Sequence, residues 1–264
     1  MAARGRHHSP STTGTARRLY CPEMLVGGAE VALDPGQGHF LRNVMRLAAG
    51  DQVRLFNEAH GEWGAEIVVL SRDRAIVRCD QCVRSPASDG GPWLFFAPVR
   101  RERVELTVEK ATELGAAVLQ PVSTRFTRPG TLREDRLRAI AREAAEQSNR
   151  LSVPQIRPAA ALDRALAEWP ADHPLLWCDE TGGGADMASV LAGLVRHKPA
   201  ELAILVGPEG GFAPDELDHL ANLPFVIRAG LGPRILKAET AAIAALTCVQ
   251  AIVGDWQTGG RPAG

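Results

Sequence analysis

The sequence predicts an α/β fold built on a parallel sheet, preceded by a smaller β domain. After residue 92, short apolar runs alternate with helical patterns, which indicates a parallel sheet with right-handed crossovers. Two of these runs, 202–206 and 225–227, end at once in loops rich in Gly and Pro. Before residue 85, apolar and polar residues alternate with period two, which predicts strands. The turn-rich segment 85–92 (SPASDGGP) is the predicted boundary.

The N-terminal part is expected to be a disordered extension, residues 1–18, followed by a β domain over 19–84. The extension holds small, polar and basic residues with little to bury. Strands are expected at 52–56, 62–70 and 75–83, with 57–61 as a hairpin connection.

A short helix is predicted before these strands. Its apolar side would be formed by residues at helical spacing, namely Phe40, Leu41, Val44 and Leu47. Its other side would present Arg42 and Arg46, either to phosphates or simply to solvent.

The C-terminal part, 92–255, is expected to alternate between strands and helices. Strands are predicted at 93–97, 118–122, 175–178, 202–206 and 225–227. Helices are predicted at 104–114, 132–148, 185–195, 215–220 and 238–253. Gly115 is expected to end the first helix in the C′ position. The last helix is rich in alanine and is expected to be largely buried.

The composition is that of an ordinary globular protein, with 45% hydrophobic residues and a net charge of −1. Its apolar runs are shorter than the roughly 18 residues that a membrane span needs, so no span is expected. Five scattered cysteines suit a reduced, cytoplasmic compartment. Cys79 and Cys82 fall in a strand pattern without a second Cys/His pair, and His7–His8 lie in the extension, so no metal site is expected.

The loop 207–211 (GPEGG) follows a predicted strand directly. It lacks the lysine and hydroxyl of a P-loop and the spacing of a dinucleotide fingerprint. Its glycines would let the main chain approach a ligand closely, and Glu209 would repel a phosphate. A single such loop is commonly an ordinary turn. Together with 230–236 and 179–184, however, it favours a ligand site at the carboxyl edge of the sheet.

Four sequence blocks carry a family resemblance. They are HFLRNVMRLAAGD at 39–51, KATELGAAVLQPVST at 110–124, EAAEQSNRLSVPQI at 143–156, and LVGPEGGFAPDE at 205–216 with LGPRILKAETA at 231–241. With these blocks in this order, residues 19–253 resemble the RsmE family of SPOUT-class RNA methyltransferases.

The resemblance implies a PUA-like β-barrel that helps to bind RNA, followed by a SPOUT domain with a deep trefoil knot. In that family the last helix passes under the cofactor loop, and two knotted domains form a homodimer. The implied activity is methylation of N3 of a uridine in 16S ribosomal RNA, with S-adenosylmethionine as cofactor and the small ribosomal subunit as partner.

The resemblance also implies a set of cofactor-binding residues at three strand ends. They are Leu176, Gly207, Pro208, Glu209, Gly210, Gly211, Leu231, Gly232, Ile235, Leu236 and Thr240. Main-chain atoms of Leu231, Ile235 and Leu236 would hold the adenine, in a dry pocket of apolar side chains.

Glu146 and Arg150 are the candidate catalytic residues. Glu146 would accept the uridine proton, and Arg150 would stabilise charge on the uracil oxygens or hold a phosphate. The alternative is a structural pair at i and i+4. Glu239 is expected to brace the cofactor loop. The expected RNA contacts are Arg42, Arg46, Lys110, Arg125, Arg128 and Asn149.

Three other functions stay open from the sequence. One is a different SPOUT reaction, on a ribose 2′-oxygen or on guanine N1. A second is a non-catalytic RNA-binding factor in ribosome assembly, and a third is an enzyme acting on a small nucleotide.

Overall fold

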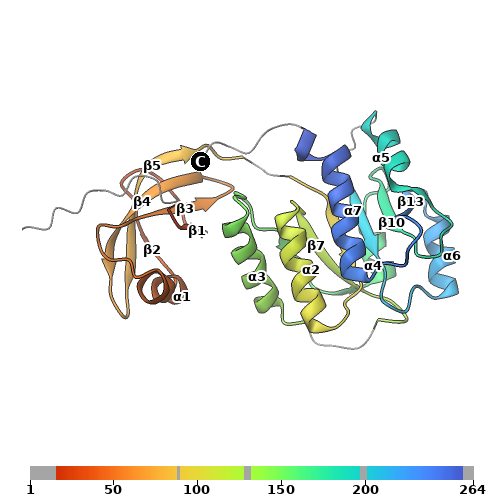
Figure 1. Ribbon diagram of the computed structural model, residues 1–264, viewed down its shortest axis with the longest axis horizontal. Helices are drawn as coiled ribbons and strands as arrows, with labels where there is room; N and C mark the ends of the chain where they lie inside the picture. The colour runs from red at the N-terminus through yellow and green to blue at the C-terminus, as the bar shows by residue number, and fades with distance from the viewer. Residues whose placement is uncertain (1–15, 88–89, 128–131, 197–200, 258–264) are drawn as a thin grey trace, which may run out of the picture. The chain divides into compact units, whose positions relative to one another are not determined.

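The structure is a computed structural model of the 264-residue chain, and it describes residues 16–87, 90–127, 132–196 and 201–257. The chain divides into two compact units that meet in sequence at Ser85 and Pro86 (Figure 1). The expected extension falls mostly on residues 1–15, which lie outside the described residues.

The smaller unit is a five-stranded sheet in the order β1-β3-β4-β5-β2. The strands are β1 (Arg18–Tyr20), β2 (Glu30–Ala32), β3 (Gln52–Asn57), β4 (Gly61–Leu70) and β5 (Ala75–Arg84). The three long strands were predicted, whereas β1 and β2 were not. Leu19, Leu41, Leu55 and Val77 form the centre of the core of this unit, each at most 2% exposed.

Arg18 corrects the expected end of the extension. It opens β1 and is buried, and its Nε donates to Glu62 Oε2 at 3.1 Å. Its guanidinium also lies 4.1 Å from the ring centre of Phe56. The ordered part of the unit therefore begins before residue 19.

The helix before β3 differs from the prediction. Helix α1 (Pro35–His39) begins at an Asp34–Gln37 capping box and continues as a wide turn, η1 (Phe40–Val44), in which Met45 N donates to Phe40 O. Arg46 ends it with φ +57. The short helical path leaves Val44 60% exposed, so its predicted place on the apolar side was wrong.

The larger unit contains the predicted parallel sheet, and the pairing of its strands confirms the α/β fold. Its strand order is β11-β13-β10-β12-β6-β7-β8, with β9 beside β7, and the strand pairs are parallel. The strands are β6 (Trp93–Phe96), β7 (Val118–Ser123), β8 (Gln155–Ile156), β9 (Ala160–Ala161), β10 (Leu175–Cys178), β11 (Ala185–Asp186), β12 (Ala203–Val206) and β13 (Val226–Gly230).

Helices cover both faces of this sheet (Figure 1). One face packs against α2 (Arg101–Glu113), α3 (Glu134–Gln147), α5 (Met187–Val195) and α7 (Ala238–Ile252), and the other against α4 (Leu162–Ala167) and α6 (Pro214–Asn222). Successive strand residues point to opposite sides: Leu176 joins the first core and Trp177 the second. Both faces are dry, which explains the continuous apolar runs in the sequence.

Helix α7 is only half buried, contrary to the expectation. Ala241, Ala245, Leu246 and Val249 pack into the core, whereas the opposite stripe is partly exposed. The segment Ala238–Gln257 has the length and mean hydropathy, 1.2, of a possible membrane span. Its packing against the sheet gives a simpler reason for this composition, because core helices are also apolar.

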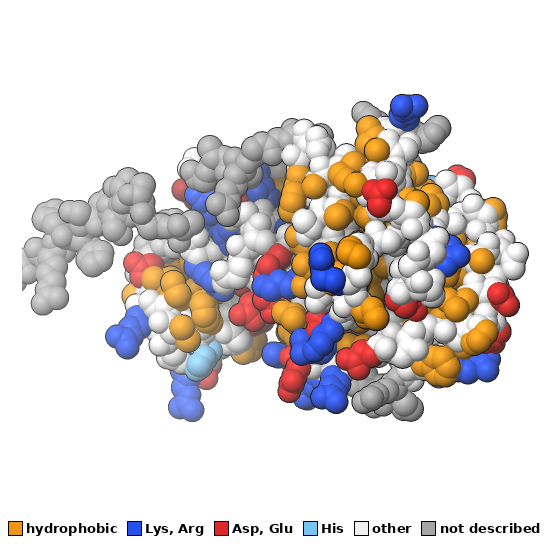
Figure 2. Space-filling model, turned by 45° about the vertical axis from the view of Figure 1, so that its right-hand side comes forward, with side chains coloured by type: hydrophobic (Ala, Val, Ile, Leu, Met, Phe, Trp, Pro, Cys, Tyr) orange, Lys and Arg blue, Asp and Glu red, His pale blue; other side chains and the backbone are white. Residues whose placement is uncertain are grey.

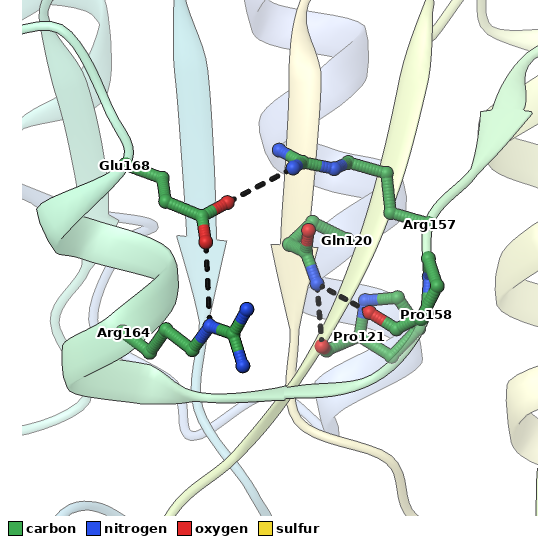
Figure 3. A network of polar contacts seen from close by, with 6 residues as sticks. All are labelled: Gln120, Pro121, Arg157, Pro158, Arg164 and Glu168. Atoms are coloured by element: carbon green, nitrogen blue, oxygen red, sulfur yellow. Dashed lines mark hydrogen bonds and ion pairs between the residues drawn. The ribbon is translucent and has the colours of Figure 1, made fainter.

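Polar contacts lie beside β7 near the edge of the sheet (Figure 3). The Gln120 amide donates to the carbonyls of Pro121 and Pro158 at 2.9 and 3.0 Å. Nearby, Glu168 accepts from both Arg157 and Arg164. The bonds of Gln120 satisfy an amide that would otherwise be buried unpaired, whereas the ion pairs of Glu168 lie at the surface.

Candidate functional site

The carboxyl ends of β10 and β13 form a pocket of about 430 Å³, here termed the β10–β13 pocket. It is lined by the segment after β10, by the segment 230–236 after β13, and by Ala241 of α7. Four residues of the expected cofactor set line it, namely Leu231, Gly232, Ile235 and Leu236. Ile235 is 92% exposed, so its apolar side chain is accessible to a ligand in this pocket.

Asp179 organises the wall of the β10–β13 pocket. Its carboxylate accepts from Thr181 N, Thr181 Oγ1, Gly183 N and Arg228 Nη2. Burial alone would raise the pKa of this carboxyl, but the hydrogen bonds from Thr181 and Arg228 outweigh burial and hold the pKa below its usual range. Asp179 is therefore ionised at neutral pH, and its hydrogen bonds hold the loop after β10 in place.

Cys178 lines this pocket, and Gly183 lies in the loop that Asp179 holds. Burial raises the pKa of the Cys178 thiol to about 12, so this thiol stays protonated and unreactive. A Cβ at position 183 would lie 2.5 Å from Arg228 Nη2, so the lack of a side chain at Gly183 leaves room for the Arg228 guanidinium. Sequence reasoning identified the 179–184 loop but missed the Asp179–Arg228 pair, because the partner lies on a different strand.

A second pocket, of about 420 Å³, lies at the carboxyl ends of β6 and β12 and is termed here the β6–β12 pocket. It is lined by Pro98, Val99, Arg100, Phe126, Pro208, Glu209 and Gly210. Three residues expected to bind the cofactor, Pro208, Glu209 and Gly210, therefore line a pocket different from that of Leu231 and Leu236. Two separate pockets were not predicted, and neither Arg100 nor Phe126 was predicted to line one.

The 207–211 loop separates the two pockets. A Cβ at position 210 would lie 3.2 Å from Phe126 Cβ, on the side of the β6–β12 pocket. A Cβ at position 211 would lie 2.9 Å from Oε1 of Glu180, which lines the β10–β13 pocket. Gly211 also has φ +71, a conformation that favours glycine. At Gly207, a Cβ would clash with the Phe212 ring.

Two further residues of the expected cofactor set lie beside the pockets. Leu176 is fully buried within β10, and its side chain belongs to the core. Thr240 is exposed on the first turn of α7, next to Ala241. Neither is among the described residues that line the β10–β13 pocket.

The expected catalytic pair lies at the end of α3. Arg150 is buried: its Nη1 donates to the carbonyls of Thr112 and Ala116 at 2.9 and 2.8 Å, and its Nη2 donates to Ser152 Oγ. Glu146 is half-buried on α3. Neither is among the described residues that line the two strand-end pockets. This placement favours a structural role for Arg150 over contact with a substrate.

The expected RNA contacts have varied surroundings. Arg46 is exposed, and Arg42 donates to Asn43. Lys110 pairs with Glu109 and Glu113 on α2, and Arg125 pairs with Asp215 of α6 at 2.5 Å. Asn149 has φ +62 just after α3, as a helix-ending residue. Arg128 lies outside the described residues.

Glu239 connects two helices rather than facing a pocket. It is 3% exposed, and its Oε1 accepts from Arg103 Nη1 at 2.6 Å. The pair fastens the first turn of α7 to α2. Among the residues that the structure describes, no three His, Cys, Asp or Glu side chains come together as a metal site.

Comparison with known proteins shows the family to which this chain belongs. The model of the RNA methyltransferase domain matches residues 92–250, and that of the RNA methyltransferase PUA domain matches 33–78. The chain belongs to the RNA methyltransferase family. The ribosomal RNA small subunit methyltransferase E of Rickettsia conorii is 31% identical over 88% of this chain and 94% of its own length.

Two solved structures of similar proteins hold the cofactor of this chemistry. The ribosomal RNA small subunit methyltransferase E of Neisseria gonorrhoeae, bound to S-adenosyl methionine, has a TM-score of 0.79 at 27% identity. A structure described as a methyltransferase of Legionella pneumophila, with bound cofactor SAM, has a TM-score of 0.81 at 28% identity. Each covers 91% of this chain and is itself 99% covered.

Proposed function

We propose that this protein transfers a methyl group from S-adenosylmethionine to N3 of a uridine in the 16S ribosomal RNA of the small subunit. The observation that carries the proposal is full-length similarity to small-subunit ribosomal RNA methyltransferases. The base and its atom rest on the resemblance of the four sequence blocks, and on a strand-end pocket of suitable size and lining.

The residues of the β10–β13 pocket fit S-adenosylmethionine. Leu231, Ile235 and Leu236 offer apolar surface to an adenine ring, and the glycine-rich main chain of 230–232 leaves room for close contact. When bound, the cofactor supplies an electrophilic methyl group on a sulfonium, and the methyl–sulfur bond breaks with its electron pair kept by sulfur. The chain itself has to hold the base and remove its N3 proton.

The smaller unit is proposed to help bind the RNA. The PUA match and the exposed Arg46 beside Arg42 support this role, because arginines can hold phosphates by paired hydrogen bonds. We further propose that its sheet closes as a barrel, that the larger unit holds the trefoil knot of SPOUT enzymes, and that the protein acts as a homodimer in the cytoplasm.

A methyl-transfer assay tests the proposal directly. The protein is incubated with labelled S-adenosylmethionine and small ribosomal subunits from a strain that lacks the enzyme, and the nucleosides are identified by mass spectrometry. We expect N3-methyluridine. A methylated ribose or guanine would contradict the proposed base, and cofactor binding without any transfer would favour a binding role in assembly.

A further inference from the structure

The β6–β12 pocket lies at the topological switch point of the parallel sheet. From β6 the chain continues through α2 to β7, on one side, and from β12 it continues through α6 to β13, on the other side. Strands β6 and β12 are neighbours, so their two following loops diverge and leave a crevice between them. Ligands of open α/β sheets bind in such crevices.

Two opposite charges line this pocket without pairing. Arg100 and Glu209 are both exposed, and neither side chain makes a hydrogen bond or ion pair with any residue that the structure describes. By contrast, Arg103, Lys110 and Arg125 on nearby elements each pair with a carboxylate. The pocket thus offers a ligand one cationic donor and one anionic acceptor.

Phe126 adds an aromatic surface that is held in place. Its side chain is 50% exposed at the pocket. The turn that contains it is closed by Thr127 N donating to Thr124 O, and it is fastened to α6 because Arg125 N donates to Glu216 Oε1. A half-exposed ring on a fixed turn is suited to stacking on a flat base.

The two pockets are also neighbours. Gly210 faces Phe126 and Gly211 faces Glu180, so one loop of the chain lies between the β6–β12 pocket and the β10–β13 pocket. Methyl transfer needs an acceptor close to the donor. A base in the first pocket and the cofactor in the second would lie on the two sides of this one short loop.

We propose that the β6–β12 pocket receives the target uracil, with Phe126 stacked on the ring, Glu209 accepting the N3 proton and Arg100 donating to a uracil oxygen beside N3. This inference rests on the proposed function and assigns the acceptor half of the site. The proton moves from N3 to a Glu209 carboxylate oxygen, and the electron pair left on N3 forms the new bond to the methyl carbon. Arg100 stabilises the negative charge that develops on the uracil oxygen.

Kinetics of Glu209→Gln at several pH values test the base. We expect methylation to fall by roughly 10²–10⁴-fold near neutral pH, since a general base contributes about that factor. The deficit should narrow as the pH approaches the range in which uridine N3 ionises unaided. The affinity for S-adenosylmethionine, measured by calorimetry, should stay unchanged. A deficit that is constant with pH would instead indicate a structural role and overturn the assignment.

Asp163→Asn and Arg196→Met are the matched controls. Asp163 is an exposed carboxylate on α4 outside both pockets, and Arg196 is an exposed arginine beyond α5. Both variants should keep near-wild-type activity, whereas Arg100→Met should lose at least tenfold in turnover. Glu146→Gln tests the rival proton acceptor. If Glu146→Gln loses activity and Glu209→Gln keeps it, the proton acceptor is Glu146 and the inference fails.

Uridine 5′-monophosphate provides a readout that is independent of turnover. In nuclear magnetic resonance titrations, the probe should shift the Phe126 ring signals, and Phe126→Ala should weaken its binding about tenfold, within the range expected of one stacked base. Shifts confined to the β10–β13 pocket, or none at millimolar probe, would count against the inference. The proposed function has its own test, the methyl-transfer assay. It fails if the wild-type protein does not produce N3-methyluridine.

Discussion

At the scale of single residues, Arg150 is a buried cross-link between the ends of α2 and α3. Its guanidinium satisfies the carbonyls of Thr112 and Ala116. Arg150→Met would leave these carbonyls without their charged donor, so we expect the free energy of unfolding to fall by about 2–4 kcal/mol. Urea unfolding measures this loss.

Arg150→Lys should recover only part of that stability, because an ammonium cannot reproduce the planar fork of a guanidinium. The folded fraction of both variants should bind S-adenosylmethionine as the wild type does. An Arg150→Met protein that is fully stable but inactive would return Arg150 to the catalytic role suggested by its sequence block.

Asp179 links stability to pH. Its folded pKa is lowered, so its contribution is complete above the unfolded value of about 3.9 and is lost as the pH falls through the lower folded value. We expect Asp179→Asn to be less stable than wild type at neutral pH, and the difference to shrink below about pH 4. Urea unfolding at pH 7 and at pH 3 compares the two proteins. A difference that does not depend on pH would contradict this account.

At the scale of elements, the end of α2 depends on Gly115. The residue has φ +81, Ala116 N donates to Ala111 O as in a Schellman motif, and a Cβ would lie 2.3 Å from Gln250 Nε2. We expect Gly115→Ala to lower the free energy of unfolding by at least about 1–2 kcal/mol through backbone strain, with the contact adding to it.

Gly193→Ala in α5 is the matched control. A Cβ at position 193 meets nothing within 4 Å, and its φ lies outside the left-handed region. This change should stabilise the protein by about 0.5–1 kcal/mol, because alanine favours the helix. Thermal unfolding of both variants gives the comparison, and equal destabilisation would argue against position-specific strain at 115.

Elements with a strong repeating pattern were predictable, and short ones were not. The 175–178 run was predicted to the residue as β10, and Gly115 ends α2 as expected. Strands β8 and β9 have two residues each, too few to give any period. The capping box at Asp34 was readable in the sequence and was overlooked, so the start of α1 was missed.

The site was predictable as loops but not as pockets. Glycine-rich strand ends identified 207–211 and 230–236, because few other patterns end an apolar run so abruptly. The sequence cannot tell which loops share a cavity, since this depends on strand order, and strands β12 and β6 lie far apart in the chain. Arg100 and Phe126 each sit in unremarkable sequence and become candidates only through that neighbourhood.

At the scale of the whole molecule, α7 presents a surface suited to self-association. One side of the helix carries small and apolar residues at helical spacing, each at least partly exposed: Thr240, Ile243, Ala244, Thr247 and Ala251. Apolar side chains are also visible across the face of the larger unit in Figure 2. Light scattering should give twice the chain mass of 28.3 kDa.

Ile243→Glu should convert that dimer to a monomer, because a charge in the middle of the stripe would be costly to bury. Ala192→Glu, on the exposed side of α5, should leave the dimer intact. A wild-type protein that is monomeric at all concentrations would refute the homodimer, and an Ile243→Glu dimer would place the interface elsewhere.

The hydrogen bonds between α2 and α7 affect the stage of synthesis at which the chain can form its cofactor pocket. Arg103 bonds Glu239 at the start of α7, and Leu114 O accepts from Gln250 near its end. Ala241, between them, completes the wall of the β10–β13 pocket. Because chains are synthesised from the N-terminus, the smaller unit can fold early, whereas this pocket lacks one wall until α7 has been made. The chain can therefore bind the cofactor only after α7 has emerged and packed against α2.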